Sequence, residues 1–331
     1  MKSIFDRVAI VGAGAIGGWL GVHLASAGCE VSALARGETL AALQRDGLQL
    51  RSGETSLQAP VTASQSSAEL GVQDLVIVAV KAPALAGVAR QIGPLIGRHT
   101  VVLTAMNGVP WWFLDGFGGA LAGTSLASTD AGGQIAREIP VRHVIGGVVH
   151  ASCSLEAPGV VRHHFGNGLI LGEPAGGASE RVSALVTLLQ QAGFNASVSP
   201  QIQKDIWYKL WGNMTVNPIS ALTGATTDRI LGDDLVRGFV SSVMLEAKAI
   251  GERLGIPIDQ QPEDRHAVTR KLGAFKTSML QDVQAGKPLE LDALVASVRE
   301  LGQLTGVATP FTDALLGLSR LQAQTLGLYP D

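Results

Sequence analysis

The chain has 331 residues, of which 46% are hydrophobic and 41 are glycine, and its formal net charge is −3. This length is enough for two domains, and a weakly acidic chain without a basic run is a poor partner for nucleic acid or anionic membrane surfaces. Cys29 and Cys153 lack a companion spacing, so we expect no disulfide framework, no metal site and a cytoplasmic location. No uninterrupted apolar stretch reaches the roughly 20 residues of a membrane span.

The first segment, RVAIVGAGAIGGWLGVHLASAGCEVSALAR over residues 7–36, indicates a strand, a turn, a helix and a second strand. Residues 8–11 form the continuous apolar run of a buried strand, and residues 16–27 have helical periodicity that ends at Gly28. Such a start can imitate a secretory signal, but Asp6 and repeated glycines interrupt it. We therefore favour the βαβ interpretation.

The turn in this segment carries a glycine pattern, Gly12-x-Gly14-x-x-Gly17. The first glycine permits a tight turn, the second lets a pyrophosphate approach the backbone, and the third lets helix and strand pack closely. Free N–H groups at the helix start, including those of Ala15 and Ile16, then favour phosphate. The pattern predicts a dinucleotide site at these five residues; a purely structural turn is the alternative.

The end of the second strand bears on the choice of cofactor. An acidic residue about 20 positions after the turn would bind the ribose hydroxyl of NAD. This strand ends instead with Arg36, and no acid precedes Glu38. A guanidinium there suits a 2′-phosphate, so we expect NADP(H); a solvated surface arginine is the alternative.

Two further buried-strand patterns, DLVIVAVKA and TVVLTAMNG, end in polar residues, Lys81 and Asn107. Ligands of open α/β sheets bind outside the carboxyl ends of the strands. We therefore expect both side chains to face the crevice of the glycine-rich turn. Lys81 would approach the cofactor, and Asn107 the nicotinamide ribose or the substrate. Strand ends that merely reach solvent are the alternative.

In the later part of the chain the pattern of secondary-structure signals changes twice. The first change extends from about residue 125 to residue 173, and within it residues 144–173 contain short β-like runs that predict antiparallel strands at the edge of the first sheet. After residue 198 nearly every segment is helical, with predicted helices over 202–223, 233–254, 262–285, 290–305 and 309–325. The prediction is a Rossmann-type doubly wound sheet with an antiparallel extension in domain 1–198, followed by an all-helical domain, 199–331.

The first of these helices is apolar nearly all round, yet Lys209, Asn213 and Asn217 recur every four residues on one face. Polar groups are costly to bury without partners, which suggests a functional stripe. A positioned ammonium can protonate the oxygen of a ketone as it is reduced, and amides can bind a hydroxyl and a carboxylate. The alternative is that Lys209 reaches solvent and the amides bond to nearby backbone.

Taken together, these motifs resemble the ketopantoate reductase (2-dehydropantoate 2-reductase) family. The similar segments are GAGAIGG, VKA, MNGV, KLWGNMTVN, TSMLQD and LELD, and they occur in the family's order over nearly the whole chain. The resemblance implies NADPH-dependent reduction of ketopantoate to pantoate, on the way to pantothenate and coenzyme A, and makes a homodimer an expectation.

The resemblance also implies residue roles. Lys209 is similar to the family's general acid, and Glu290 to the acid that contacts substrate or nicotinamide ribose and orients that lysine. Four residues look like substrate contacts: Asn107, Asn213, Asn217 and Ser278. Arg36 looks like the residue that reads the 2′-phosphate. The position of Glu290 and Asp292 near a helix start has a simpler explanation in the helix dipole.

Some features depart from the family pattern. Leu289 replaces the small hydroxyl residue common before the glutamate, and the aromatic run at residues 111–113 follows Asn107 directly. These aromatics could narrow the substrate pocket, which leaves another 2-oxo acid open, or they could pack between domains. Two other classes stay open: a non-catalytic NADP(H)-binding regulator, and an opine-type dehydrogenase that would need His266 and Asp264 as a pair.

Overall fold

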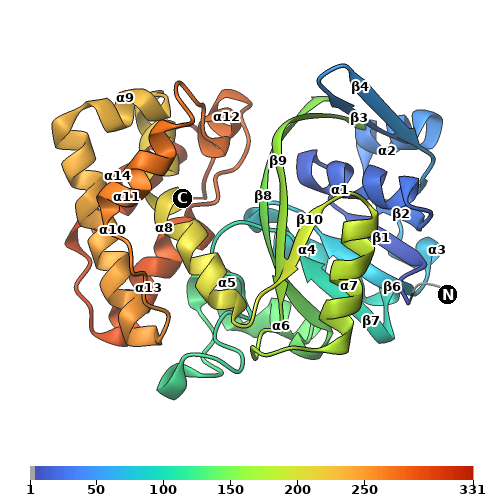
Figure 1. Cartoon of the computed structure of the whole chain (residues 1–331), viewed down its shortest axis with the longest axis horizontal. Coiled ribbons are helices and arrows are strands. Elements are labelled where there is room, and N and C mark those ends of the chain that lie inside the picture. The colour runs from blue at the N-terminus through green and yellow to red at the C-terminus, as the bar shows by residue number, and fades with distance from the viewer. Residues whose placement is uncertain (1–3, 331) are drawn as a thin grey trace. The chain divides into compact units, whose positions relative to one another are not determined.

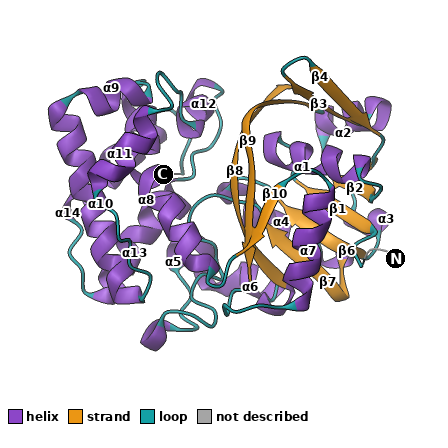
Figure 2. Ribbon diagram, in the orientation of Figure 1, coloured by secondary structure: helices purple, strands orange, loops and turns teal. Residues whose placement is uncertain are grey.

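The computed structural model describes residues 4–330 and divides into two compact units. The first unit comprises residues 4–106 and 133–202; the second comprises residues 107–132 and 203–330. Within the described chain all strands belong to the first unit, and the second is helical (Figure 2). The units match the predicted order of sheet and helices, but residues 107–132 join the helices. The domain boundary itself stays a prediction.

Ten strands form one sheet within residues 4–330, in the order β4-β3-β9-β8-β7-β6-β1-β2-β5, with β10 beside β9 (Figure 1). Their bounds are β1 (Arg7–Val11), β2 (Glu30–Leu34), β3 (Leu48–Ser52), β4 (Thr55–Ala59), β5 (Thr62–Ser64), β6 (Gln73–Val78), β7 (Ile96–Thr104), β8 (Val144–Ala157), β9 (Val160–Gly172) and β10 (Asn195–Val198). The neighbours β7, β6, β1, β2 and β5 pair in parallel, which confirms the Rossmann-type arrangement.

The antiparallel part of the sheet continues beyond β7. β8 pairs in parallel with β7 and antiparallel with β9, so this long hairpin extends the parallel strands as predicted. The sheet does not end there, because β9 also pairs with β3, whose own hairpin partner is β4. The β3–β4 hairpin lies in a segment without a strong strand pattern, and the sequence analysis did not predict it.

Helix α1 (Ala15–Ser26) contacts strands of both parts of this sheet: β1 and β2, and also β3, β4, β8 and β9. A Cβ on Gly18 would lie 2.7 Å from Val161 Cγ2, and one on Gly21 would lie 2.7 Å from Leu48 Cδ1. Trp19 is buried and its ring stacks on that of His163, with centroids 5.9 Å apart. The helix is rich in glycine because the sheet encloses it closely.

The remaining helices of the first unit are short, except for α7. They are α2 (Gly37–Asp46), α3 (Ser67–Leu70), η1 (Ala82–Ala84), α4 (Leu85–Ala89), η2 (Gly93–Leu95), α6 (Gln134–Glu138), η5 (Val141–His143) and α7 (Glu180–Gln191). Ser179 caps α7 by accepting a hydrogen bond from Val182 N at 3.2 Å. The apolar face of α7 then packs into the same core as α1 and the sheet.

The second unit contains helices in the predicted segments, with small differences in their bounds and two larger departures. Its elements are η3 (Gly119–Leu121), α5 (Ala127–Asp130), α8 (Ile202–Thr223), α9 (Thr227–Gly232), α10 (Asp234–Leu254), α11 (Pro262–Arg270), α12 (Ser278–Gln284), η6 (Asp292–Ala296), α13 (Ser297–Thr305) and α14 (Pro310–Thr325), and η4 (Ala131–Gly133) spans the unit boundary. The helix α9 was not predicted. The single helix predicted over 262–285 is wrong, because Gly273 has φ +63° and Thr277 starts a new helix by accepting from Leu280 N.

Two tryptophans fix the orientation of α8. The indole N–H of Trp207 donates to Ala247 O at 3.2 Å, and that of Trp211 donates to Met244 O at 2.7 Å, both on α10. Lys209 follows Trp207 by two residues, a rotation of about 200° around an α-helix. The polar stripe therefore lies on the side of α8 that faces away from α10.

Candidate active site

The glycine-rich turn lies between β1 and α1, where it was predicted. Gly12 has φ +94°, and a Cβ on it would lie 2.7 Å from Val80 Cγ1. A Cβ on Gly17 would lie 2.1 Å from Gly12 O, so only glycine lets the helix approach the turn this closely. Around Gly14, in contrast, a Cβ would meet no atom within 4 Å. This glycine leaves open space at the helix start.

The start of α1 presents unused backbone donors. Gly14 is the N-cap and has no side chain to accept a hydrogen bond, and the first turn contains no acidic residue. The first backbone donor within the helix is Gly18 N, which reaches Gly14 O at 2.8 Å. The N–H groups of Ala15, Ile16 and Gly17 precede it and point along the positive end of the helix dipole. This arrangement fits the phosphates of a dinucleotide.

Two basic residues follow the strands that lie on either side of β1. Arg36 comes after β2, is the N-cap residue of α2 and is exposed; Lys81 comes after β6 and precedes η1. Because β2 and β6 both pair in parallel with β1, their carboxyl ends lie on the same edge of the sheet as Gly12. Asn107 belongs to the other compact unit. The expectation that Lys81 and Asn107 both face the crevice of the glycine-rich turn therefore stays a prediction.

In the helical unit, Lys209 Nζ donates a hydrogen bond to Asn107 Oδ1 at 2.8 Å. Lys209 and Asn107 are distant in sequence and were predicted as site residues on separate grounds. The structure places their side chains in contact. Burial lowers the pKa of Lys209 to about 8; the nearby Glu290 carboxylate acts to raise this pKa, and the Arg265 guanidinium acts to lower it. Glu290 itself is only 4% exposed. A partly buried ammonium, a buried carboxylate and an amide therefore form one cluster.

The backbone around this cluster is fixed at two points. Val109 N donates to Ala293 O at 2.8 Å, and Leu294 N donates to Glu290 O at 3.2 Å. Gly108 has φ +83°, and a Cβ there would lie 2.4 Å from Ala293 O. The turn that carries Asn107 and the segment that carries Glu290 thus contact each other directly. Ala293 lies in η6, a π-helical turn of the kind that is frequent at functional sites.

The two amides of the stripe have no structural partners. Asn217 is 7% exposed and Asn213 is partly buried, and within residues 4–330 neither side chain makes a hydrogen bond. The alternative in which these amides bond to neighbouring backbone is therefore wrong. Ser278 is exposed at the first position of α12, and the structure shows no hydrogen bond between it and the cluster.

Sequence reasoning missed one charged residue beside the cluster, Arg265 on α11. Its guanidinium carbon lies 5.2 Å from the centroid of the Tyr208 ring. A Cβ on Gly212 would lie 2.7 Å from Arg265 Nε, so the guanidinium rests on the backbone of α8. A glycine in the middle of a long helix was the available signal, but it does not identify its partner.

The aromatic run after Asn107 is buried: Trp111, Trp112 and Phe113 are 5%, 1% and 0% exposed. Gln203 Nε2 donates to Phe113 O at 3.2 Å, and the rings of Phe113 and Trp207 have centroids 6.1 Å apart. Phe113 is therefore part of the core of the helical unit. A role for it in narrowing a substrate pocket has no support in this packing.

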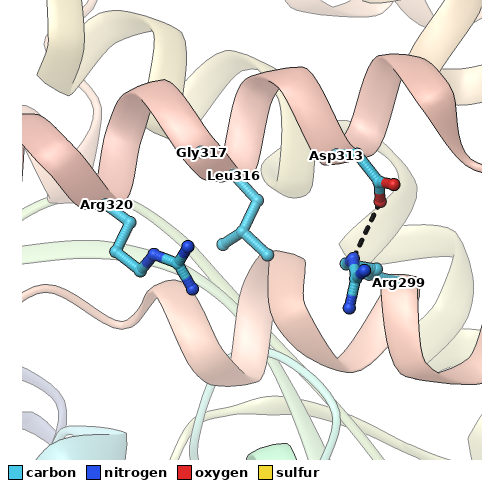
Figure 3. Close-up of a pocket in the computed structure, with 5 residues that line it drawn as sticks. All are labelled: Arg299, Asp313, Leu316, Gly317 and Arg320. Atoms are coloured by element: carbon cyan, nitrogen blue, oxygen red, sulfur yellow. Dashed lines mark hydrogen bonds and ion pairs between the residues drawn. The ribbon is translucent and has the colours of Figure 1, made fainter.

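A pocket elsewhere in the helical unit does not resemble a reaction site. It has a volume of about 270 Å³, lies between α13 and α14, and is lined by Arg299, Asp313, Leu316, Gly317 and Arg320 (Figure 3). Arg299 Nε pairs with Asp313 Oδ1 at 2.9 Å, and both side chains are more than 40% exposed. No helix within residues 4–330 is long and apolar enough to cross a membrane.

The family models confirm the resemblance. Residues 8–111 match the model "Ketopantoate reductase PanE/ApbA", and residues 201–323 match "Ketopantoate reductase PanE/ApbA C terminal". A 2-dehydropantoate 2-reductase of Mesorhizobium japonicum is 47% identical over 98% of this chain and 99% of its own. One from a Nostoc species is 27% identical over 93% of this chain and 92% of its own.

Solved structures give the same result. A crystal structure described as a candidate ketopantoate reductase of Ralstonia solanacearum MolK2 is 58% identical, with TM-score 0.95, over 98% of this chain and all of that one. The 2-dehydropantoate 2-reductase of Geobacter metallireducens GS-15 is 28% identical, with TM-score 0.84, over 96% of this chain and 99% of its own.

Proposed function

This chain belongs to the ketopantoate reductase family of pyridine-nucleotide-dependent oxidoreductases, which act on CH–OH groups, and we propose that it reduces 2-dehydropantoate (ketopantoate) to pantoate with NADPH. One observation carries this proposal: the partly buried Lys209 donates a hydrogen bond to Asn107 and lies near Glu290, and its pKa is lowered to about 8. A general acid works best when its pKa is near the operating pH, and this lysine meets that requirement.

NADPH supplies the hydride when bound. Its pyrophosphate fits the turn of Gly12, Gly14 and Gly17, with the first N–H groups of α1, because this helix start lacks both a side-chain cap and an acid. Arg36, exposed after β2, suits the 2′-phosphate, and Lys81 suits other cofactor oxygens. These assignments also favour NADPH over NADH.

The cluster in the helical unit suits the other half of the reaction. The ammonium of Lys209 stabilises the negative charge that develops on the substrate oxygen and then gives it a proton. Asn107 accepts a hydrogen bond from that ammonium at 2.8 Å and holds it in place. The Glu290 carboxylate favours the protonated lysine, which opposes the effect of burial. The unpaired amides of Asn213 and Asn217, together with Ser278, supply polar contacts for the substrate.

We extend the proposal to the wider role that the family implies. The product would feed the synthesis of pantothenate and coenzyme A in the cytoplasm, and the protein would act as a homodimer. A related reductase of another 2-oxo acid remains the second candidate. The departure at Leu289 gives that candidate no support, because this side chain is 2% exposed and belongs to the core.

Two other classes are disfavoured by specific contacts. A regulator that only binds NADP(H) has no use for a partly buried Lys209 near the buried Glu290, since removing charged groups from water is costly. An opine-type dehydrogenase needs a His–Asp pair. Asp264 instead accepts a hydrogen bond from Gln261 N at 2.9 Å, and both ring nitrogens of His266 are buried without a partner.

The test is NADPH oxidation by the purified protein with ketopantoate, beside a panel of other 2-oxo acids and with NADH as the alternative cofactor. We expect a kcat/KM for ketopantoate of about 10⁴ M⁻¹s⁻¹ or more, well above the panel. Good turnover of a different 2-oxo acid would show that this acid, and not ketopantoate, is the substrate. Binding of NADPH without turnover of any acid would overturn the reductase proposal in favour of a regulator.

A further inference from the structure

A second cation, Arg265, lies beside Lys209. Lys209 and Arg265 are both cations, and Glu290 is the carboxylate that acts on Lys209 with them. Within residues 4–330 the Arg265 guanidinium makes no ion pair and no hydrogen bond, and its Nε atom is buried without a partner. The described chain therefore leaves this guanidinium beside the lysine without a carboxylate partner. A fixed cation of this kind attracts an anion of matching shape.

The position of this guanidinium is fixed by packing. Its central carbon lies over the Tyr208 ring, 5.2 Å from the centroid, and this cation–π contact favours the observed position. On its other side it rests where a Cβ on Gly212 would be, 2.7 Å from Nε and 2.9 Å from Nη2. Any larger residue at position 212 would displace it. The glycine in the middle of α8 thus makes room for an arginine whose side chain has no structural hydrogen bond.

The position also matches the chemistry of the substrate. Gly212 is three residues after Lys209, a spacing that puts their side-chain positions about 5–6 Å apart on one side of the helix. In a 2-oxo acid the carboxylate carbon is bonded directly to the carbonyl carbon. A group that binds the carboxylate must therefore lie close to the group that protonates the carbonyl oxygen. Arginine binds carboxylates through two parallel hydrogen bonds, which fixes orientation as well as charge.

We propose that Arg265 binds the carboxylate of the 2-oxo acid and thereby orients the carbonyl oxygen towards Lys209. This inference rests on the proposed function for its substrate class. Arg265 would bind the substrate, and Gly212 would leave the space that its guanidinium needs. The inference also explains why a cation that lowers the pKa of Lys209 lies beside that lysine. The substrate carboxylate would neutralise that charge when it binds.

The experiment measures binding and turnover separately. For binding, the protein saturated with NADP⁺, which has no hydride to give, is titrated with ketopantoate and with its lactone, which lacks the carboxylate, and calorimetry gives both affinities. Turnover is measured in a separate assay with NADPH. Arg265→Met is compared with Arg270→Met, a matched change at an exposed arginine of the same helix. Circular dichroism and NADPH affinity verify the fold of each variant, and Arg265→Lys replaces Arg265→Met if the latter does not fold.

We expect wild-type protein to bind ketopantoate more tightly than the lactone, and Arg265→Met to lose roughly 30-fold or more in affinity for ketopantoate alone. Added guanidinium ion should restore part of that loss, which a merely structural role would not allow. The inference is overturned if Arg265→Met matches Arg270→Met, or if wild-type protein does not prefer the carboxylate. The protein could bind ketopantoate more tightly than the lactone in a way that depends on Arg265 and yet not reduce ketopantoate. That result would support this inference and contradict the proposed reduction.

Discussion

At the scale of single residues, Lys209 carries the clearest prediction. Lys209→Met removes the ammonium and keeps an unbranched side chain that fits a partly buried position. We expect kcat to fall by about 10² to 10⁴, because general acid catalysis contributes that much, while NADPH affinity stays within about twofold. Steady-state kinetics and a fluorescence titration with NADPH give the two values. An equal loss in both would show that Lys209 supports cofactor binding and not proton transfer.

The pH dependence gives a second residue-scale prediction. The reaction needs the protonated lysine, whose pKa is about 8, so kcat/KM should fall as the pH rises through about 8. The Glu290 carboxylate raises the pKa of Lys209, so Glu290→Gln should move this falling limb to lower pH. The profile is measured for both proteins with saturating NADPH. If the falling limb stayed at the same pH in Glu290→Gln, Glu290 would have no influence on the pKa of Lys209.

Much of this cluster could be predicted from the sequence, and the reason is local. Lys209, Asn213 and Asn217 follow helical spacing, and Asn107 follows a buried strand, so periodicity alone singles them out. Arg265 could not be found this way. Its significance comes from contact with Tyr208 and Gly212, and only tertiary packing brings these residues together.

At the scale of elements, the segment that carries Glu290 is held by the last residues of the described chain. Leu289 N donates to Leu328 O at 3.0 Å, and the Tyr329 hydroxyl donates to Asp292 Oδ1 at 2.5 Å. Burial and the Asp292 carboxylate raise the pKa of Tyr329, so this phenol remains a hydrogen-bond donor at neutral pH. These two contacts flank Glu290 on both sides. The C-terminal segment therefore positions an acid that it does not itself contain.

This gives a prediction for Tyr329→Phe, which keeps the ring and removes the hydrogen bond. We expect kcat to fall several-fold and the pH limb of Lys209 to move down, as in Glu290→Gln but less far. The cost in stability should be about 1 kcal/mol, the usual value for a single hydrogen bond. Asp292→Asn, which leaves an acceptor for the phenol, is the control. Loss of stability with an unchanged pH profile would restrict Tyr329 to a structural role.

Element bounds were predicted where the sequence marks them and missed where long-range contacts decide. Helix α8 has the predicted ends, 202 and 223. The helix predicted over 262–285 is divided because Gly273 adopts a left-handed conformation and Thr277 caps the separate helix α12. The strand β3 is stabilised by β9, a partner distant in sequence, so its own short pattern was too weak to reveal it.

At the scale of the whole molecule, each compact unit contributes one half of the proposed chemistry. The sheet unit contains the glycine-rich turn that we propose binds the phosphates, and the helical unit contains the cluster around Lys209. The sequence predicted a sheet followed by helices because strand and helix patterns occupy different parts of the chain. It did not predict that residues 107–132 join the helices, since that depends on contacts such as that between Gln203 and Phe113 O.

The glycines of the turn and of α1 are of two kinds: some are in close contact with the sheet, and Gly14 faces open space. Alanine substitutions should distinguish the two kinds. A Cβ at Gly21 would lie 2.7 Å from Leu48 Cδ1, whereas one at Gly14 meets no atom within 4 Å. Gly21→Ala should therefore lower the free energy of unfolding by about 1–3 kcal/mol, the cost of overpacking. NADPH affinity below the unfolding transition should change little.

Gly14→Ala should show the opposite behaviour. The new methyl group would occupy the space at the start of α1 where we place the pyrophosphate, so NADPH affinity should fall by at least tenfold while the unfolding temperature changes little. Thermal unfolding without cofactor and NADPH titration give both quantities for each variant. If Gly14→Ala bound NADPH as well as wild type, the phosphates could not lie against this turn. The open space at Gly14 would then need another explanation, and the fold would retain its enclosed helix without the cofactor role proposed for it.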